Sequence, residues 1–112
     1  MIYNGVEVLE KDGAVAVLIS PGYGAGWSTW NDNKIAYDKR VVEYFDNHPP
    51  KLTGKELDEA EVYLASIGYP ETYMGGYNQI EKEWVPVGTP FLIKEYDGSE
   101  RITKPDECIM FK

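Results

Sequence analysis

Ala14-Val15-Ala16-Val17-Leu18-Ile19 is the stretch that decides the fold. Consecutive apolar residues, half of them β-branched, favour a strand that is covered on both faces. Lys11-Asp12-Gly13 precedes this stretch, and an Asp-Gly pair supplies the positive φ that a tight hairpin turn needs. Val6 to Glu10 then reads as the partner strand of an antiparallel hairpin. We therefore expect a sheet built around residues 14–19.

Two short helices are expected next. Asp38 can cap a helix from Arg40 to Asn47, and Pro49-Pro50 ends it because proline disfavours a helical residue before it. Thr53-Gly54-Lys55-Glu56 has the capping-box pattern of a second helix, which Gly68 stops. The apolar face of this second helix consists of Leu57, Ala60, Leu64 and Ile67.

The rest of the chain reads as β-structure. Strands are predicted at 72–74, 79–85, 91–96, 99–103 and 107–111, with a second tight turn at Asp97-Gly98. The expected fold is a single α+β domain over residues 1–112, in the order ββ-αα-βββ(β). Its antiparallel or mixed β-sheet carries the two short helices on one face.

Composition limits the classes of function. The net charge is −8, and nucleic-acid phosphates or anionic membranes demand a basic surface, so direct binding to either is not expected. An acidic surface instead suits a basic partner. The start of the chain has no signal-peptide pattern and no apolar run approaches a membrane span, so we expect a soluble, cytoplasmic protein. With one cysteine, Cys108, and one histidine, His48, neither a disulfide nor a metal site is expected, nor is a cofactor.

A segment rich in glycine and tryptophan follows the apolar stretch: Ser20-Pro21-Gly22-Tyr23-Gly24-Ala25-Gly26-Trp27-Ser28-Thr29-Trp30-Asn31. It lacks the GxGxxG spacing of a dinucleotide loop, and no GK[ST] of a phosphate loop follows. Two interpretations remain open. The segment is a ligand-contacting loop with flat aromatic faces, or it is a structural turn pinned by two buried tryptophans.

The candidate binding residues fall into three groups, and no catalytic residue identifies itself. The loop contributes Tyr23, Trp27, Ser28, Trp30 and Asn31. The predicted strands contribute Trp84, Lys94 and Tyr96, which suit a nucleotide pocket if the strands neighbour the loop. The second helix contributes Asp58, Glu59 and Glu61, an acidic patch for a partner. The plainer alternative is that the aromatic residues form the core and the carboxylates only face water.

Four motifs resemble a known group of proteins. GYGAGWSTW at 22–30, YMGG at 73–76, WVPVGT at 84–89 and EYDGSE at 95–100 occur in this order along nearly the whole chain. The combination resembles a family of small, mostly uncharacterised proteins encoded by bacteriophages and prophages.

This resemblance implies an origin in a phage or mobile element and an action in the cytoplasm of the host bacterium. Small phage proteins of this kind are often anti-defence factors, which favours binding over catalysis. The first partner we expect is a bacterial defence protein, blocked in the manner of an anti-CRISPR protein. The alternative partner is a nucleotide second messenger, sequestered by a sponge of the kind that commonly forms homo-oligomers. A minor structural protein of the phage particle, or an enzyme with Glu83 or Glu95 as its general base, are the remaining alternatives.

Overall fold

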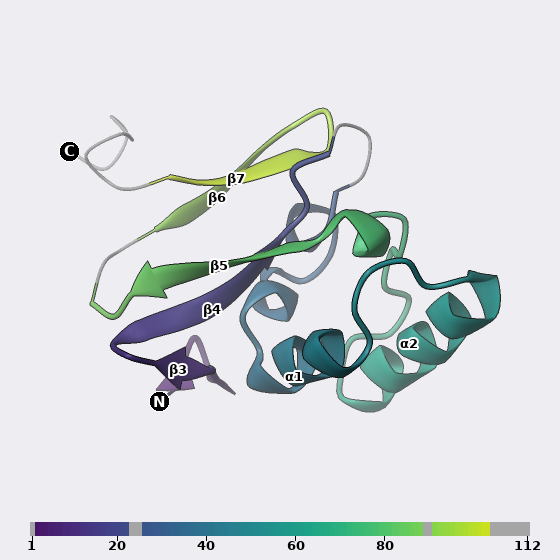
Figure 1. The fold of residues 1–112 in the computed structure, drawn as a ribbon, viewed down its shortest axis with the longest axis horizontal. Coiled ribbons are helices and arrows are strands. Elements are labelled where there is room, and N and C mark those ends of the chain that lie inside the picture. Colours follow the sequence, from purple (N-terminus) through teal and green to yellow (C-terminus); the bar gives the residue numbers. More distant parts are fainter. Residues whose placement is uncertain (1, 23–25, 89–90, 104–112) are drawn as a thin grey trace.

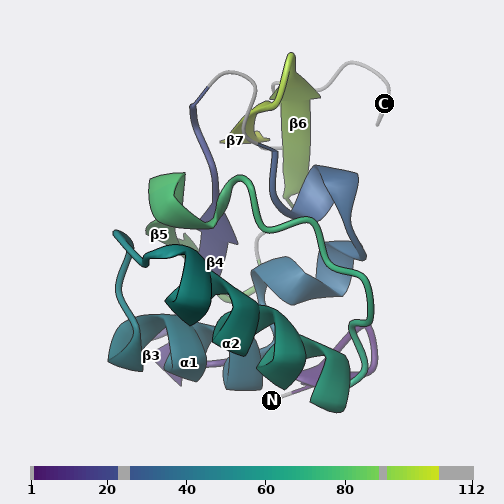
Figure 2. The same ribbon diagram turned by 90° about the vertical axis from the view of Figure 1, so that its right-hand side faces the viewer.

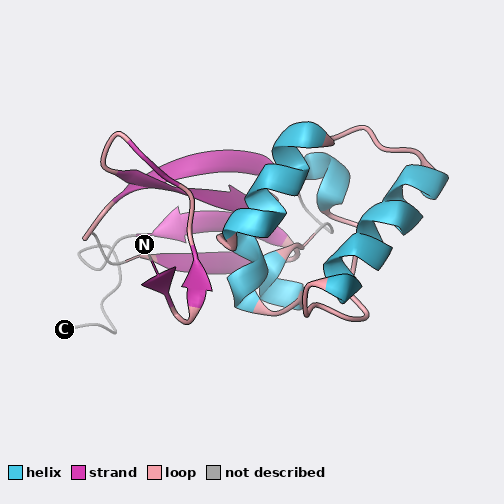
Figure 3. Ribbon diagram, turned by 90° about the horizontal axis from the view of Figure 1, so that it is seen from below, coloured by secondary structure: helices cyan, strands magenta, loops and turns pink. Residues whose placement is uncertain are grey.

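The computed structural model describes residues 2–22, 26–88 and 91–103, and it has the expected α+β class. Antiparallel strand pairs lie beside two helices, which gather on one side of the strands when the molecule is seen from below (Figure 3). The strands are β1 (Ile2–Tyr3), β2 (Val6–Glu7), β3 (Glu10–Lys11), β4 (Ala14–Ile19), β5 (Glu81–Pro86), β6 (Leu92–Tyr96) and β7 (Ser99–Thr103). The α-helices are α1 (Lys39–Asn47) and α2 (Gly54–Ser66). Short 3-10 helices cover Ser28–Trp30, Asn33–Ala36 and Tyr77–Gln79.

Strand β4 is the centre of the fold, as its apolar sequence predicts. It pairs along its whole length with β5, antiparallel, and its first residues pair with β3 (Figure 1). Side chains alternate across a strand, so Ala16 and Leu18 enter the core beneath the helices while Val15 and Val17 enter a second apolar cluster. Burial on both faces explains why no polar residue interrupts this strand.

The first predicted strand is broken, which corrects the expected hairpin of 6–10 with 14–19. Asn4 and Gly5 both adopt positive φ, 50° and 85°, and form an additional tight turn that pairs β1 with β2. Only Glu10–Lys11 then remains to pair with β4 across the predicted turn at Asp12 and Gly13. An Asn-Gly turn so close to the Asp-Gly turn divides the segment into two hairpins instead of one.

The C-terminal half contains one confirmed hairpin and one wrong prediction. Strands β6 and β7 pair across Asp97-Gly98, whose φ values of 51° and 83° fit the predicted turn. Residues 72–74 do not form a strand; loop and turn structure leads from there into the 3-10 helix Tyr77–Gln79. The predicted strand at 107–111 lies outside the described residues.

Both helices begin as predicted. The Asp38 carboxylate accepts the backbone N–H of Arg40 at the start of α1, and Thr53 and Glu56 form the capping box of α2. Leu64 of α2 and Phe45 of α1 are buried in the core cluster that includes Leu18. In Figure 2, α2 faces the viewer and the segment 67–76 rises from its end across the same side of the molecule. Over the residues that the structure describes, neither helix has the length and apolar character needed to cross a membrane.

Candidate functional site

The glycine- and tryptophan-rich segment is organised around a buried carboxylate. Glu100 of β7 is 1% exposed, and its Oε1 accepts the N–H of Ser20 (3.0 Å). Its Oε2 accepts the N–H groups of Trp27 (2.8 Å) and Thr29 (2.9 Å), together with the Thr29 hydroxyl (2.6 Å). Several neutral donors replace the lost hydration of this charge, so the carboxylate fixes the shape of the loop.

The backbone reinforces this attachment of the hairpin to the loop. The N–H of Glu100 donates to the carbonyl of Ser20 (2.8 Å), and the Ser99 hydroxyl donates to the carbonyl of Pro21 (2.7 Å). Sequence reasoning placed Glu100 only in a motif and missed this role. The contact joins residues up to 80 positions apart, so no local pattern indicates it.

Trp27 and Ser28 lie in the interior. Both are fully buried, and the Trp27 ring meets the edge of Tyr77 with a centroid distance of 6.1 Å. Among the described residues, neither the Trp27 Nε1–H nor the Ser28 hydroxyl has a hydrogen-bond partner. For Trp27 the structural interpretation therefore holds: its ring pins the loop and offers no open face to a ligand.

Trp30 and Tyr73 instead form an aromatic pair on the surface. Their exposed fractions are 43% and 41%, and their ring centroids are 5.2 Å apart. A side chain at Gly26 would overlap the Trp30 ring, and one at Gly75 would overlap the Tyr73 ring. Two glycines of the loop motifs therefore make room for two exposed rings.

Asn31 joins the two segments that carry this pair. Its Oδ1 accepts the N–H of Tyr73 (2.8 Å), and its side-chain amide donates to the carbonyls of Tyr73 (3.1 Å) and Trp27 (2.9 Å). The Asn31 side chain is thus used inside the protein, where it holds the exposed pair in place.

Trp84 does not complete an aromatic pocket with the other two tryptophans. It lies on β5 opposite Ala16, 42% exposed, with the Lys82 ammonium 5.5 Å from its ring centroid. Trp27 meets Tyr77, whereas Trp30 meets Tyr73, so each tryptophan belongs to a different neighbourhood. The candidate residue Tyr23 lies outside the described residues.

Lys94 and Tyr96 lie on the β6–β7 hairpin. Lys94 stands directly opposite Arg101, and Tyr96 opposite Ser99. These four residues and Glu95 line a cleft of about 200 Å³. The cleft is lined by residues of the hairpin alone. It therefore does not form the expected joint site with Trp84.

The acidic patch of α2 faces outward. Asp58 and Glu59 are exposed and Glu61 is half-buried, while the neighbouring Val62 is 70% exposed. A shallow depression of about 280 Å³ is lined by Asp58, Glu61, Val62, Ala65 and Glu71. No basic side chain in the described part of the chain pairs with Asp58, Glu59 or Glu61. The patch is therefore an unneutralised surface with an apolar centre.

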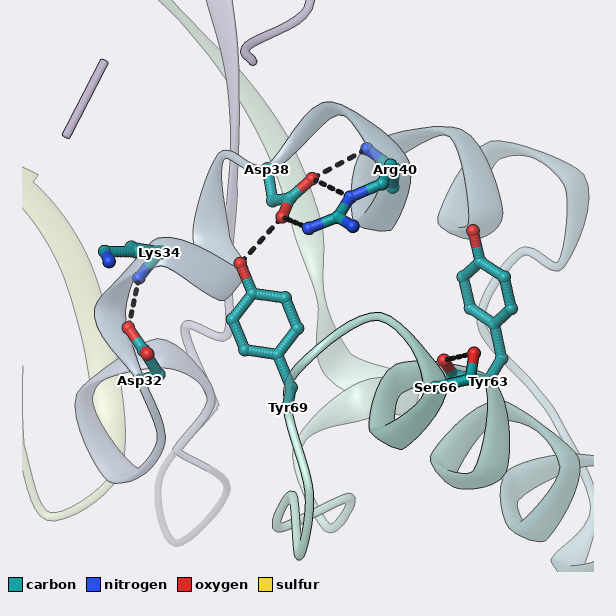
Figure 4. Close-up of polar contacts among 7 residues, drawn as sticks. All are labelled: Asp32, Lys34, Asp38, Arg40, Tyr63, Ser66 and Tyr69. Carbon is teal, nitrogen blue, oxygen red and sulfur yellow. Dashed lines mark hydrogen bonds and ion pairs between the residues drawn. The ribbon is translucent and has the colours of Figure 1, made fainter. Parts of the chain in front are cut away.

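A second buried carboxylate, Asp38, joins α1 to the segment after α2 (Figure 4). The Arg40 guanidinium donates to both carboxylate oxygens (3.1 and 2.7 Å), and the Tyr69 hydroxyl donates to Oδ2 (2.7 Å). Burial favours the neutral acid, but the bonds from Arg40 and Tyr69 outweigh it and hold the pKa of Asp38 below its usual value. Burial, and then the bond to Asp38, raise the pKa of the Tyr69 phenol. The sequence indicated Asp38 only as a cap.

Among the described residues, no group of three or more His, Cys, Asp or Glu side chains is placed to hold a metal ion. A scan against protein-family models and searches of curated proteins and of solved structures each find no match to this chain.

Proposed function

We propose that the chain is a phage-encoded, non-enzymatic binding protein that inhibits a bacterial defence system by docking on a basic surface of a defence protein. The observation that carries the proposal is the outward face of α2, where Asp58, Glu59 and Glu61 surround Val62 and have no ion-pair partner in the described part of the chain. The phage origin rests on the resemblance of the four sequence motifs.

The chemistry of this face suits a protein partner with a positive surface. Uncompensated carboxylates steer a basic partner towards the face and repel nucleic acid. Val62 offers apolar area at the centre of the patch, as a protein interface requires. Trp30 and Tyr73 form a further exposed aromatic pair outside this face, and these residue types most often dominate binding energy.

A role without catalysis is supported by how the fully buried carboxylates of the described residues are used. Asp38 and Glu100 are both bonded to several donors that belong to the fold itself. Groups so occupied serve to hold segments together, and they are poorly placed to accept a proton from a substrate.

The test is phage plating on bacterial strains that each carry one defence system, with and without the protein. We expect the protein to restore plating on at least one strain. The triple variant Asp58→Lys, Glu59→Lys, Glu61→Lys should lose the effect, because it reverses the charge of the docking face. The matched control Glu10→Lys, Glu81→Lys, Glu83→Lys changes the net charge equally at exposed positions of β3 and β5 and should keep it. Equal activity of both triple variants would reject the acidic face.

A second candidate function is the nucleotide sponge, and one observation favours it. Lys94 and Arg101 are directly opposite in the β6–β7 cleft, where two like charges repel unless an anion lies between them. If the cleft binds a nucleotide, cyclic dinucleotides should raise the melting temperature, and Lys94→Ala with Arg101→Ala should remove the rise. An unchanged melting temperature across such a panel would count against the sponge.

A further inference from the structure

A groove of about 590 Å³ runs between α1 and α2, next to the acidic face. It is lined by Arg40, Glu43, Tyr44, Asp46, Asn47 and Tyr63. Tyr44 stacks on Tyr63 with centroids 4.6 Å apart and planes at 15°, and on its other side it stacks on His48 at 4.0 Å. Three nearly parallel rings, from α1, from the residue that caps its C-terminus and from α2, therefore form a rigid aromatic wall in which the tyrosines line the groove.

The charges around this wall leave an excess of negative charge. Arg40 is bound to Asp38 (2.7 Å), and Lys82 is bound to Asp46 (2.6 Å), so each of these cations is already paired. Glu43 is exposed and has no ion-pair partner in the described part of the chain. Glu59 of α2 is close enough to contribute, after burial, to raising the pKa of the Tyr44 phenol.

We propose that this groove binds an arginine side chain of the partner protein, with its guanidinium against Tyr63, since both faces of Tyr44 are already covered by Tyr63 and His48, and with an ion pair to Glu43. The inference rests on the proposed function, since it names the chemistry that the partner presents to the α1–α2 side. A planar, weakly hydrated guanidinium can stack on an aromatic ring and still donate to a carboxylate. A lysine ammonium holds its water more strongly, and a phosphate would be repelled by Glu43 and Glu59.

The test is an NMR titration of the purified protein with an acetylated tri-arginine amide and, separately, with the tri-lysine peptide of equal charge. The arginine peptide should shift the amide signals of 40–47 and 59–63 and should bind more tightly than the lysine peptide. Glu43→Gln, an exposed position that the fold does not use, should weaken arginine binding about threefold. Tyr63→Leu should weaken it as well, whereas the control Glu10→Gln should leave it unchanged.

Two results would overturn the groove assignment. One is equal binding of the two peptides, which would show attraction by net charge alone. The other is an unchanged affinity in Glu43→Gln, whose fold is read from the same spectra. The titration needs no defence protein. A failure of the groove assignment can therefore be detected even if the protein restores phage plating. Arginine binding without any effect on plating would instead reject the proposed function and keep the groove.

Discussion

At the scale of single residues, Glu100 links parts of the molecule that are up to 80 positions apart in sequence. Its buried carboxylate collects the N–H groups of Ser20, Trp27 and Thr29 and thereby closes the loop against β7. A buried charge is stable only when such donors surround it, and the donors are equally dependent on the charge.

Glu100→Ala should therefore leave several backbone donors without an acceptor and lower the free energy of unfolding by about 3 kcal/mol. Glu100→Gln should also destabilise the protein, because its amide places a donor against the N–H donors. Urea unfolding at neutral pH measures both losses. The exposed control Glu10→Gln should change stability by less than about 0.5 kcal/mol. A Glu100→Ala variant as stable as this control would contradict the role of the carboxylate.

Asp38 gives the protein a pH dependence of known sign. Its pKa in the folded protein lies below the unfolded value of about 3.9. The contribution of Asp38 to the free energy of unfolding is therefore complete above that pH. The contribution is lost as the pH falls through the folded pKa, because the proton then removes the charge that Arg40 and Tyr69 stabilise.

Asp38→Asn should be less stable than wild type at pH 7, and the difference should shrink as urea unfolding is repeated towards pH 3. Tyr69 has the opposite pH dependence. Because the pKa of its phenol is raised in the folded protein, its contribution to stability is complete below the unfolded value of about 10. That contribution is lost as the pH rises through the folded pKa. A stability difference between Asp38→Asn and wild type that stays constant from pH 7 to pH 3 would contradict this account.

At the scale of elements, the loops carry the exposed aromatic pair on glycine backbone. Gly26 lies against carbon atoms of the Trp30 ring, whereas Gly75 lies against the hydroxyl end of Tyr73. The Trp30 ring lies with its face against the Gly26 backbone, so it cannot move away easily from an added methyl group. The hydroxyl end of Tyr73 can move away by a small rotation of the side chain.

Gly26→Ala should displace Trp30 and cost about 1–3 kcal/mol, more than Gly75→Ala. The tryptophan emission spectrum and the melting temperature report the change. Gly54→Ala is the matched control, because nothing lies near an added Cβ at the start of α2 and alanine favours the helix. A Gly26→Ala variant with unchanged emission would show that Trp30 does not rest on this glycine.

The elements that local sequence determines were predictable. The apolar run of β4, the Asp-Gly turns at 12–13 and 97–98, and the caps of α1 and α2 each depend on neighbouring residues only. The division of the first strand was not predictable from residues 6–10 alone, because it depends on a second positive-φ turn at Asn4-Gly5. The candidate surface on α2 was predictable from charge, but the burial of Trp27 and the exposure of Trp30 depend on tertiary contacts with Tyr77 and Tyr73.

At the scale of the whole molecule, the contacts that stabilise the loop and the exposed charge of α2 belong to different parts of the fold. The sheet and the Glu100 contacts hold the loop, while α2 and the segment 67–76 lie on one side of the molecule, where α2 carries exposed carboxylates. A net charge of −8 makes attraction to a basic partner sensitive to salt, so binding should weaken as ionic strength rises.

The side of the molecule that contains α2 is the proposed docking surface. Hydrogen–deuterium exchange of the protein, alone and in complex with a defence protein identified by the plating assay, measures this surface directly. We expect slower exchange in 54–66 and 67–76 in the complex, with little change in β3 and the exposed end of β5. Protection confined to the β6–β7 hairpin, with α2 exchanging as in the free protein, would contradict it.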